Sequence, residues 1–249
     1  MNERSNKIIK LDNVQSITKF LQQPTVKIAE GLTGVLASPI QDWKLSAGKI
    51  VQAIVKGSLL TQLGREFQYY INKGKIKEDY LATEKNRISF NELLKFIDED
   101  VPDEISFNAM KSIFLRSISK KATKKDEVLA YQLMQICKKL SSGEILILKA
   151  AYNIANGKYR KEISESDLDI GRADLWFGII AKQIGHGISE LVEQQEESLS
   201  NLKLISRREA KPNYGQTSHD TFIRTVYFRL TSLGYKLCEF ITKYEKIKK

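Results

Sequence analysis

Cysteine is scarce in this chain: only Cys137 and Cys238 occur among its 249 residues. Both fall at apolar positions of a helix-like pattern, where a free cysteine behaves as a small buried hydrophobic residue. Two cysteines placed in this way exclude a disulfide-rich secreted domain and are typical of a protein that is kept reduced. We therefore expect two buried free thiols and a cytoplasmic location.

Long apolar runs are also missing. The N-terminal residues MNERSNKIIKLDNVQ lack the apolar core of a secretory signal. The longest candidate for a membrane span, GLTGVLASPIQ at 31–41, is shorter than the roughly 18 apolar residues that a span needs, and it contains Pro39. We expect neither a signal peptide nor a membrane-spanning helix.

Histidine, the commonest acid–base group at neutral pH, occurs only at His186 and His219. Neither residue has cysteine, histidine or glutamate neighbours at metal-binding spacing. The chain also contains no phosphate-binding GxxxxGK[ST], no GxSxG and no HExxH. We therefore expect a protein that is not an enzyme and that holds no metal and no cofactor.

Positive charge, in contrast, is abundant. The chain has 40 Lys and Arg against 30 Asp and Glu, which gives a formal net charge of +10. Such a balance favours anionic partners: nucleic acid, an acidic lipid surface or an acidic protein.

The first part of the chain, residues 1–104, is predicted to be a helical region. Its clearest element is an amphipathic helix over 45–71, in which apolar residues recur every three or four positions while Lys49 and Lys56 fall on another face. Its apolar face can pack on a protein core, or the basic helix can lie on an anionic membrane surface. The acidic run DEDVPDE at 98–104 then predicts a boundary and favours the start of the next helix.

Residues 105–140 are predicted to be a connecting pair of helices. The loop between them, SKKATKKDE, carries Lys120, Lys121, Lys124 and Lys125. Four ammonium groups can neutralise backbone phosphates and release counterions, which makes these lysines candidate nucleic-acid ligands. No aromatic residue lies among them to stack on bases, and a solvated loop explains the same pattern.

Residues 141–249 are predicted to form a winged helix: three helices, a β-hairpin and a return helix. The first helix starts with the capping-box spacing of Ser141 and Glu144, and the second carries Trp176 on an apolar face. The third runs through ISELVEQQEESLSN, with Ile188, Leu191, Val192, Leu199 and Leu202 expected to face inward. LKLISRR and FIRTVYFRL alternate in polarity and predict two strands, and LTSLGYKLCEFI predicts the return helix. The fold class is therefore mainly α, with an N-terminal helical region followed by the winged helix.

The third helix of this unit would enter DNA in a winged-helix protein, yet it contains no lysine or arginine. Its predicted outer face instead carries a set of acidic and amide side chains: Glu190, Glu193, Gln194, Glu197 and Asn201. Two like charges about 4 Å apart repel by roughly 4 kcal/mol at an effective dielectric near 20, so these carboxylates oppose docking on phosphates. We interpret Glu190, Glu193, Glu197 and Asn201 as candidate protein-binding residues. Arg207, Arg208 and Lys211 in the hairpin remain candidates for contacts with DNA through the wing alone.

Several hydrophobic sequence segments of this chain resemble those of known protein families. LKLIS and LTSLG look like the segments that enter and leave the wing of winged-helix domains. The span from about residue 40 to residue 240 resembles the Abi-alpha (abortive-infection alpha) family of bacterial helical proteins, through ASPIQDWKLSAGKIV, EISFNAMKSIFLRSISKKATKKDEVLAYQLMQICKKLSSGEILILKAAYNI and LTSLGYKLCEFI. The resemblance implies a role in bacterial defence against phage and supplies no catalytic residues.

These observations lead to three hypotheses. The first is a non-enzymatic, cytoplasmic phage-defence protein that acts by binding a protein partner or by self-association. The second is a DNA-binding regulator that uses the wing and the basic C-terminal tail, which carries Lys243, Lys246, Lys248 and Lys249. The third is an effector that acts at a membrane surface through the helix that contains Lys49 and Lys56.

Overall fold

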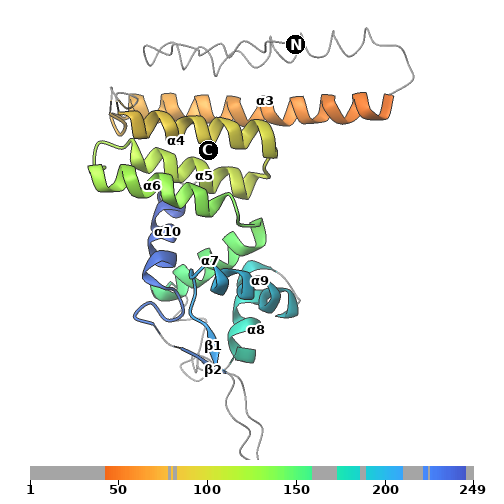
Figure 1. The fold of residues 1–249 in the computed structure, drawn as a ribbon, viewed down its shortest axis with the longest axis vertical. Helices are drawn as coiled ribbons and strands as arrows, with labels where there is room; N and C mark the ends of the chain where they lie inside the picture. The colour runs from red at the N-terminus through yellow and green to blue at the C-terminus, as the bar shows by residue number, and fades with distance from the viewer. Residues whose placement is uncertain are drawn as a thin grey trace, which may run out of the picture. The chain divides into compact units, whose positions relative to one another are not determined.

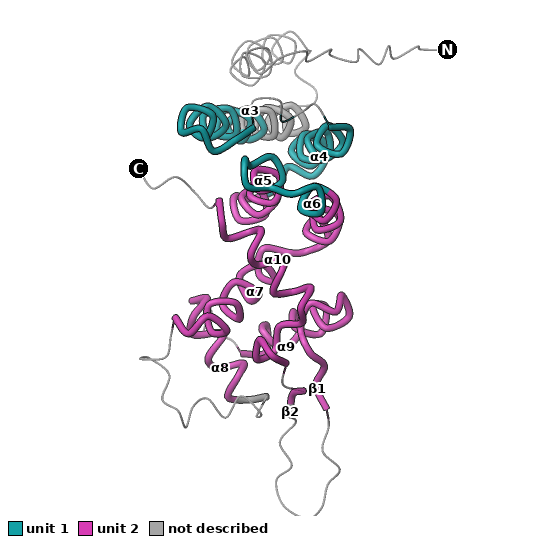
Figure 2. Tube along the Cα trace, turned by 90° about the vertical axis from the view of Figure 1, so that its left-hand side faces the viewer, with its two compact units in different colours: residues 1–102, 117–127 teal, residues 103–116, 128–249 magenta. Residues whose placement is uncertain are grey.

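The computed structural model describes residues 43–77, 80, 83–158, 173–185, 189–209, 221–223 and 225–244. Within these residues the protein is mainly helical, as predicted, and its strands are short (Figure 1). The chain divides into two compact units (Figure 2). Unit 1 comprises residues 1–102 and 117–127, and unit 2 comprises residues 103–116 and 128–249.

Unit 1 begins with the long helix α3, Trp43–Asn72, which confirms the predicted helix. It continues with α4, Glu84–Lys95, and the π-helix η2, Phe96–Asp100. The Thr83 side chain caps α4 by accepting a hydrogen bond from the backbone of Asn86. In the core, the Phe67 ring lies 5.6 Å from the Tyr80 ring and 6.1 Å from the Phe90 ring, measured between centroids. These aromatic contacts hold α3 and α4 together.

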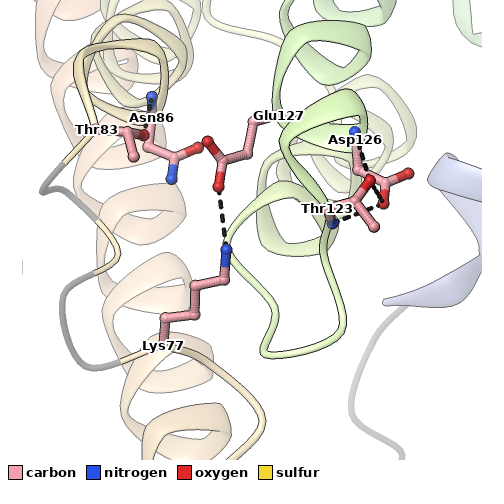
Figure 3. Close-up of polar contacts among 6 residues, drawn as sticks. All are labelled: Lys77, Thr83, Asn86, Thr123, Asp126 and Glu127. Carbon is pink, nitrogen blue, oxygen red and sulfur yellow. Dashed lines mark hydrogen bonds and ion pairs between the residues drawn. The ribbon is translucent and has the colours of Figure 1, made fainter.

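The segment 117–127 completes unit 1 by pairing with the chain that follows α3. Ile76 and Ser119 form an antiparallel bridge, in which the Lys77 amide donates to the Ile118 carbonyl at 3.1 Å. The ion pair of Lys77 Nζ with Glu127 Oε1, at 3.0 Å, reinforces this pairing (Figure 3). Within the second stretch, Thr123 and Asp126 are hydrogen-bonded to each other at the start of α6. Two stretches about fifty residues apart in the chain are therefore fixed side by side.

Unit 2 contains most of α5, Glu104–Ser117, and of α6, Lys124–Cys137, with α7, Ser142–Ala155, and α10, Ser232–Lys243. Asp103 caps α5 by accepting from the Ser106 amide at 2.9 Å. Ser112 lies fully buried in α5 and donates to the Phe240 carbonyl at 2.7 Å, and it accepts from the Tyr244 amide at 3.1 Å. These two hydrogen bonds connect α5 to the C-terminal part of α10.

The predicted capping box at the start of α7 is confirmed: Ser141 accepts from the Glu144 amide, and the Glu144 carboxylate accepts from the Ser141 amide. After α7 follow α8, Ala173–Ile184, and α9, Ser189–Asn201. At Gly185 the chain leaves α8 with φ +73°, the left-handed conformation that suits glycine at a helix end.

The hairpin after α9 is shorter than predicted. β1, Arg208–Glu209, pairs antiparallel with β2, Thr221–Phe222, with Arg208 opposite Phe222. The prediction of a continuous strand over 222–230 is wrong, because the chain reverses within 225–228, where Thr225 pairs with Phe228. Val226 is consequently 93% exposed instead of buried, whereas Arg229 is 2% exposed.

Both cysteines are free and buried, as predicted. Burial raises the pKa of the Cys137 thiol to about 12 and raises that of Cys238 as well. Among the described helices, none combines the length and the apolar character needed to cross a membrane.

Candidate functional site: the groove between helix α9 and the hairpin

One face of α9 packs inward and the other lines a cavity. The buried residues of the helix are Val192, Glu196 and Leu199, at spacings of four and three. The cavity has a volume of about 490 Å³ and is lined by outer residues of α9, the buried Glu196, Phe177 of α8, the start of the hairpin, Phe222 and Arg229. We call this cavity the α9 groove. It is lined by Phe177, Glu190, Glu193, Gln194, Glu196, Glu197, Ser200, Asn201, Ser206, Arg207, Arg208, Phe222 and Arg229.

The structure brings together most residues that the sequence singled out in this unit. All four candidate protein-binding residues, Glu190, Glu193, Glu197 and Asn201, line the groove. Two of the three candidate DNA-contacting residues, Arg207 and Arg208, line the same cavity. The third, Lys211, lies outside the described residues, as do His186 and His219.

A buried ion pair forms the floor of the groove. The Arg229 guanidinium pairs with the Glu196 carboxylate, and these side chains are 2% and 4% exposed. Trp176 Nε1 also donates to Glu196, and Arg229 Nη2 donates to the Ser206 carbonyl at 3.0 Å. The guanidinium carbon lies 3.2 Å from the centre of the Phe222 ring, which adds a cation–π contact. The floor therefore has a fixed geometry.

Burial changes the protonation equilibria of this pair. Desolvation raises the pKa of Glu196, and the charge of Arg229 with the hydrogen bond from Trp176 opposes that rise. Desolvation likewise lowers the pKa of Arg229, against the attraction of Glu196. The pair thus holds together two groups whose charged forms are each disfavoured by the surroundings.

The rim of the groove is more acidic than basic. Arg208 pairs with Glu193, both about half exposed, so this arginine neutralises one carboxylate of the helix. Glu190 and Glu197 are exposed, and no ion pair joins either of them to another described residue. Four glutamates and three arginines line the groove altogether, and the unpaired carboxylates are available to a cationic ligand.

The floor also has unused hydrogen-bonding capacity. Arg229 Nε and Ser206 Oγ are buried and have no hydrogen-bond partner among the described residues. Both residues line the groove. A buried donor without a partner is costly, so the floor of the groove carries a local free-energy cost in this structure.

Sequence reasoning missed Glu196 and misplaced Leu191. Leu191 is 41% exposed, contrary to the prediction that it faces inward, and Glu196 is the charged residue that takes a buried position. The signal was present in the spacing, since Glu196 lies four residues after Val192 and three before Leu199. Its partner Arg229 lies in FIRTVYFRL, which does not form the predicted continuous strand.

The remaining candidate residues lie in unit 1. Lys120, Lys121, Lys124 and Lys125 are all exposed, in and after the segment that pairs with Ile76. Lys56 forms an ion pair with Asp98 at 2.9 Å, so a partner already compensates its charge. The backbone of Lys49 belongs to α3, and its side chain lies outside the described part of the structure.

Within the described residues, no group of three His, Cys, Asp or Glu side chains is arranged to hold a metal ion. No protein-family model, no curated protein and no solved structure matches this chain. The interpretation of the α9 groove therefore depends on its own chemistry.

Proposed function

We propose that this chain is a non-enzymatic, cytoplasmic bacterial protein of phage defence that acts by binding a partner protein in the α9 groove. The observation that carries the proposal is the groove itself: a cavity of about 490 Å³ with a fixed charged floor and rim carboxylates that form no ion pair with a described residue. The resemblance of residues 40–240 to the Abi-alpha family supports the role in defence. Protein association through such a groove requires no catalytic group.

The elements of unit 2 support a winged-helix arrangement. Helices α7, α8 and α9 are followed by the β1–β2 hairpin and by α10, which is the order of a winged helix. In this arrangement α9 stands where a DNA-reading helix would be. We propose that the same architecture here presents α9 to a protein instead.

The chemistry of the groove favours a basic polypeptide segment as the ligand. Glu190 and Glu197 on the rim can accept hydrogen bonds from lysine or arginine side chains. The cavity volume falls in the range of about 300–1,000 Å³ typical of ligand pockets.

The same features argue against DNA binding by this face. Two exposed carboxylates on α9 would meet phosphates, and the attraction of Arg208 for phosphate is reduced because it pairs with Glu193. Arg207 is the groove arginine that remains exposed without an ion pair to a described residue. A wing-only contact is therefore a weaker proposal than protein association.

The test is reversal of the rim charge. We expect Glu190→Lys/Glu197→Lys to lose phage protection and capture of the partner from infected cells, because the acidic rim becomes basic. These positions are preferable to Glu193, whose replacement would also break the ion pair with Arg208. The matched control is Glu99→Lys/Asp100→Lys, which makes the same charge change at exposed residues of unit 1.

The outcomes separate the hypotheses. The proposal is supported if the groove variant loses phage protection and partner capture while the control variant retains both. Light scattering shows whether the partner is a second copy of this chain. Wild-type protection by the groove variant removes α9 from the mechanism. A duplex-DNA mobility shift that decreases with salt and disappears in Arg207→Gln would instead favour the DNA-binding regulator.

A further inference from the structure

The structure joins two lysine-rich segments that the sequence separates. NKGKIK at 72–77 follows α3, and SKKATKK at 119–125 leads into α6. Ile76 and Ser119 form the bridge between them, and the Lys120 amide donates to the Lys75 carbonyl at 2.8 Å. A Cβ added at Gly74 would lie 3.7 Å from Lys120 Nζ, so the Lys120 side chain extends over the turn of the other segment.

Six exposed lysines result from this pairing, and we call them the lysine patch. They are Lys73, Lys75, Lys120, Lys121, Lys124 and Lys125. The seventh lysine of the two segments, Lys77, is half-buried and pairs with Glu127, which is itself buried (Figure 3). Two nearby carboxylates in the described part of the chain have structural roles: Glu127 holds Lys77, and Asp126 accepts from the amide and hydroxyl of Thr123 at 2.9 Å each.

An exposed aromatic ring borders the lysine patch. Lys73 Nζ lies 5.9 Å from the centre of the Tyr69 ring, and Tyr69 is 38% exposed. The sequence places no aromatic residue within SKKATKK, and Tyr69 borders the lysine patch on the side of Lys73, which follows it by four residues. Lysines beside an exposed aromatic ring are the combination that single-stranded nucleic acid requires, since phosphates pair with ammonium groups and bases stack on rings.

The apolar residues of these segments are directed away from solvent. Ile76 is 2% exposed and Ile118 is fully buried. Membrane-surface binding by amphipathic elements needs apolar side chains that enter the lipid boundary, and the described residues of the two segments offer none. The lysine patch is therefore suited to a ligand bound by charge with some stacking.

We propose that the lysine patch binds the phosphate backbone of nucleic acid without reading its sequence. This inference is independent of the proposed function, because the residues involved belong to unit 1 and the α9 groove belongs to unit 2. Each patch lysine that meets a phosphate releases counterions, so binding weakens steeply as salt increases.

The experiment measures fluorescence anisotropy of labelled single-stranded and duplex DNA with the full chain across a salt series. We expect Lys120→Gln/Lys121→Gln/Lys124→Gln/Lys125→Gln to weaken binding at low salt at least about 10-fold. The slope of log affinity against log salt should become shallower by roughly 3 to 4, about one for each lost phosphate contact. Tyr69→Ala should weaken the binding of single-stranded DNA more than the binding of duplex DNA, because only unpaired bases stack on the ring.

The control removes the same charge elsewhere. Lys85→Gln/Lys139→Gln/Lys182→Gln/Lys203→Gln replaces four exposed lysines outside the patch. Retained binding in this variant, with loss in the patch variant, supports the proposal; thermal melting confirms that both variants fold. Three results would overturn it: an equal loss of nucleic-acid binding in the patch and control variants, no nucleic-acid binding by the wild-type chain at low salt, or binding to phosphatidylserine vesicles without binding to nucleic acid.

Discussion

At the scale of single residues, Gly234 shows how closely α10 approaches Leu204, in the segment between α9 and β1. A Cβ at this position would overlap the carbonyl oxygen of Leu204, which is main chain and cannot rotate away. The same carbonyl accepts a hydrogen bond from the Thr231 amide at 3.1 Å, at the N-cap of α10. Only glycine allows this contact and the helix cap to coexist.

We expect Gly234→Ala to lower the free energy of unfolding by about 1–3 kcal/mol, the usual cost of overpacking. Gly178 in α8 supplies the control, because a Cβ there meets no atom within 4 Å. Gly178→Ala should stabilise the protein by about 0.5–1 kcal/mol, since alanine loses less backbone entropy in a helix. Urea denaturation of both variants checks this, and equal effects would mean that the approach of Gly234 to Leu204 is looser in solution.

The buried pair of Glu196 and Arg229 also acts at the residue scale. We expect Arg229→Met to destabilise the protein by about 3–5 kcal/mol at neutral pH, because it leaves a buried carboxylate without its cation. Adding Glu196→Gln should recover part of this loss, since the amide oxygen still accepts from Trp176 and no charge remains.

The loss in Arg229→Met should also depend on pH. Burial raises the pKa of Glu196 above its ordinary value of 4.5, and removal of Arg229 raises it further. An acid with a raised folded-state pKa contributes stability below the unfolded pKa and loses it as pH increases through the folded pKa. The destabilisation measured in urea should therefore be smaller near pH 4.5 than near pH 8, and a pH-independent loss would contradict the burial of this charge.

At the scale of elements, helices were predictable where local chemistry determines them. The capping box of Ser141 and Glu144 marks the start of α7, and the periodic apolar residues of 45–71 indicate α3. The hairpin was less predictable. The alternation of polar and apolar residues over 222–230 resembles that of a strand, but backbone hydrogen bonds between Thr225 and Phe228 and between Tyr227 and Leu230 reverse the chain. Alternation describes side-chain polarity and does not reveal a tight turn.

Both functional surfaces depend on contacts between elements that are distant in sequence. The outward acids of α9 followed from helix periodicity, whereas the burial of Glu196 requires Arg229, thirty-three residues later. The lysine patch likewise requires that Ile76 pair with Ser119. Each lysine segment is visible in the sequence alone, but their pairing is not, because no local rule specifies a bridge between them.

At the scale of the whole molecule, the net charge of +10 alone predicts attraction to any polyanion. The structure refines this expectation, because the two charged surfaces belong to different compact units and have opposite character. Within the described residues, no ion pair neutralises Glu190 or Glu197 of the α9 groove, and none neutralises the six lysines of the patch. Net charge therefore does not describe what either surface attracts.

This division predicts that the two surfaces can be inactivated separately. We expect Glu190→Lys/Glu197→Lys to abolish partner capture and to leave the salt slope of nucleic-acid binding within about one unit of wild type. The quadruple lysine-to-glutamine variant of the patch should reduce nucleic-acid binding and retain partner capture. Because residues without shared partners contribute additively, the combined variant should show both losses at the sizes measured singly. Partner capture and anisotropy measured on all four proteins check this prediction. If the patch variant also loses its partner, nucleic acid bridges the two proteins; the α9 groove is then not the site that holds the partner.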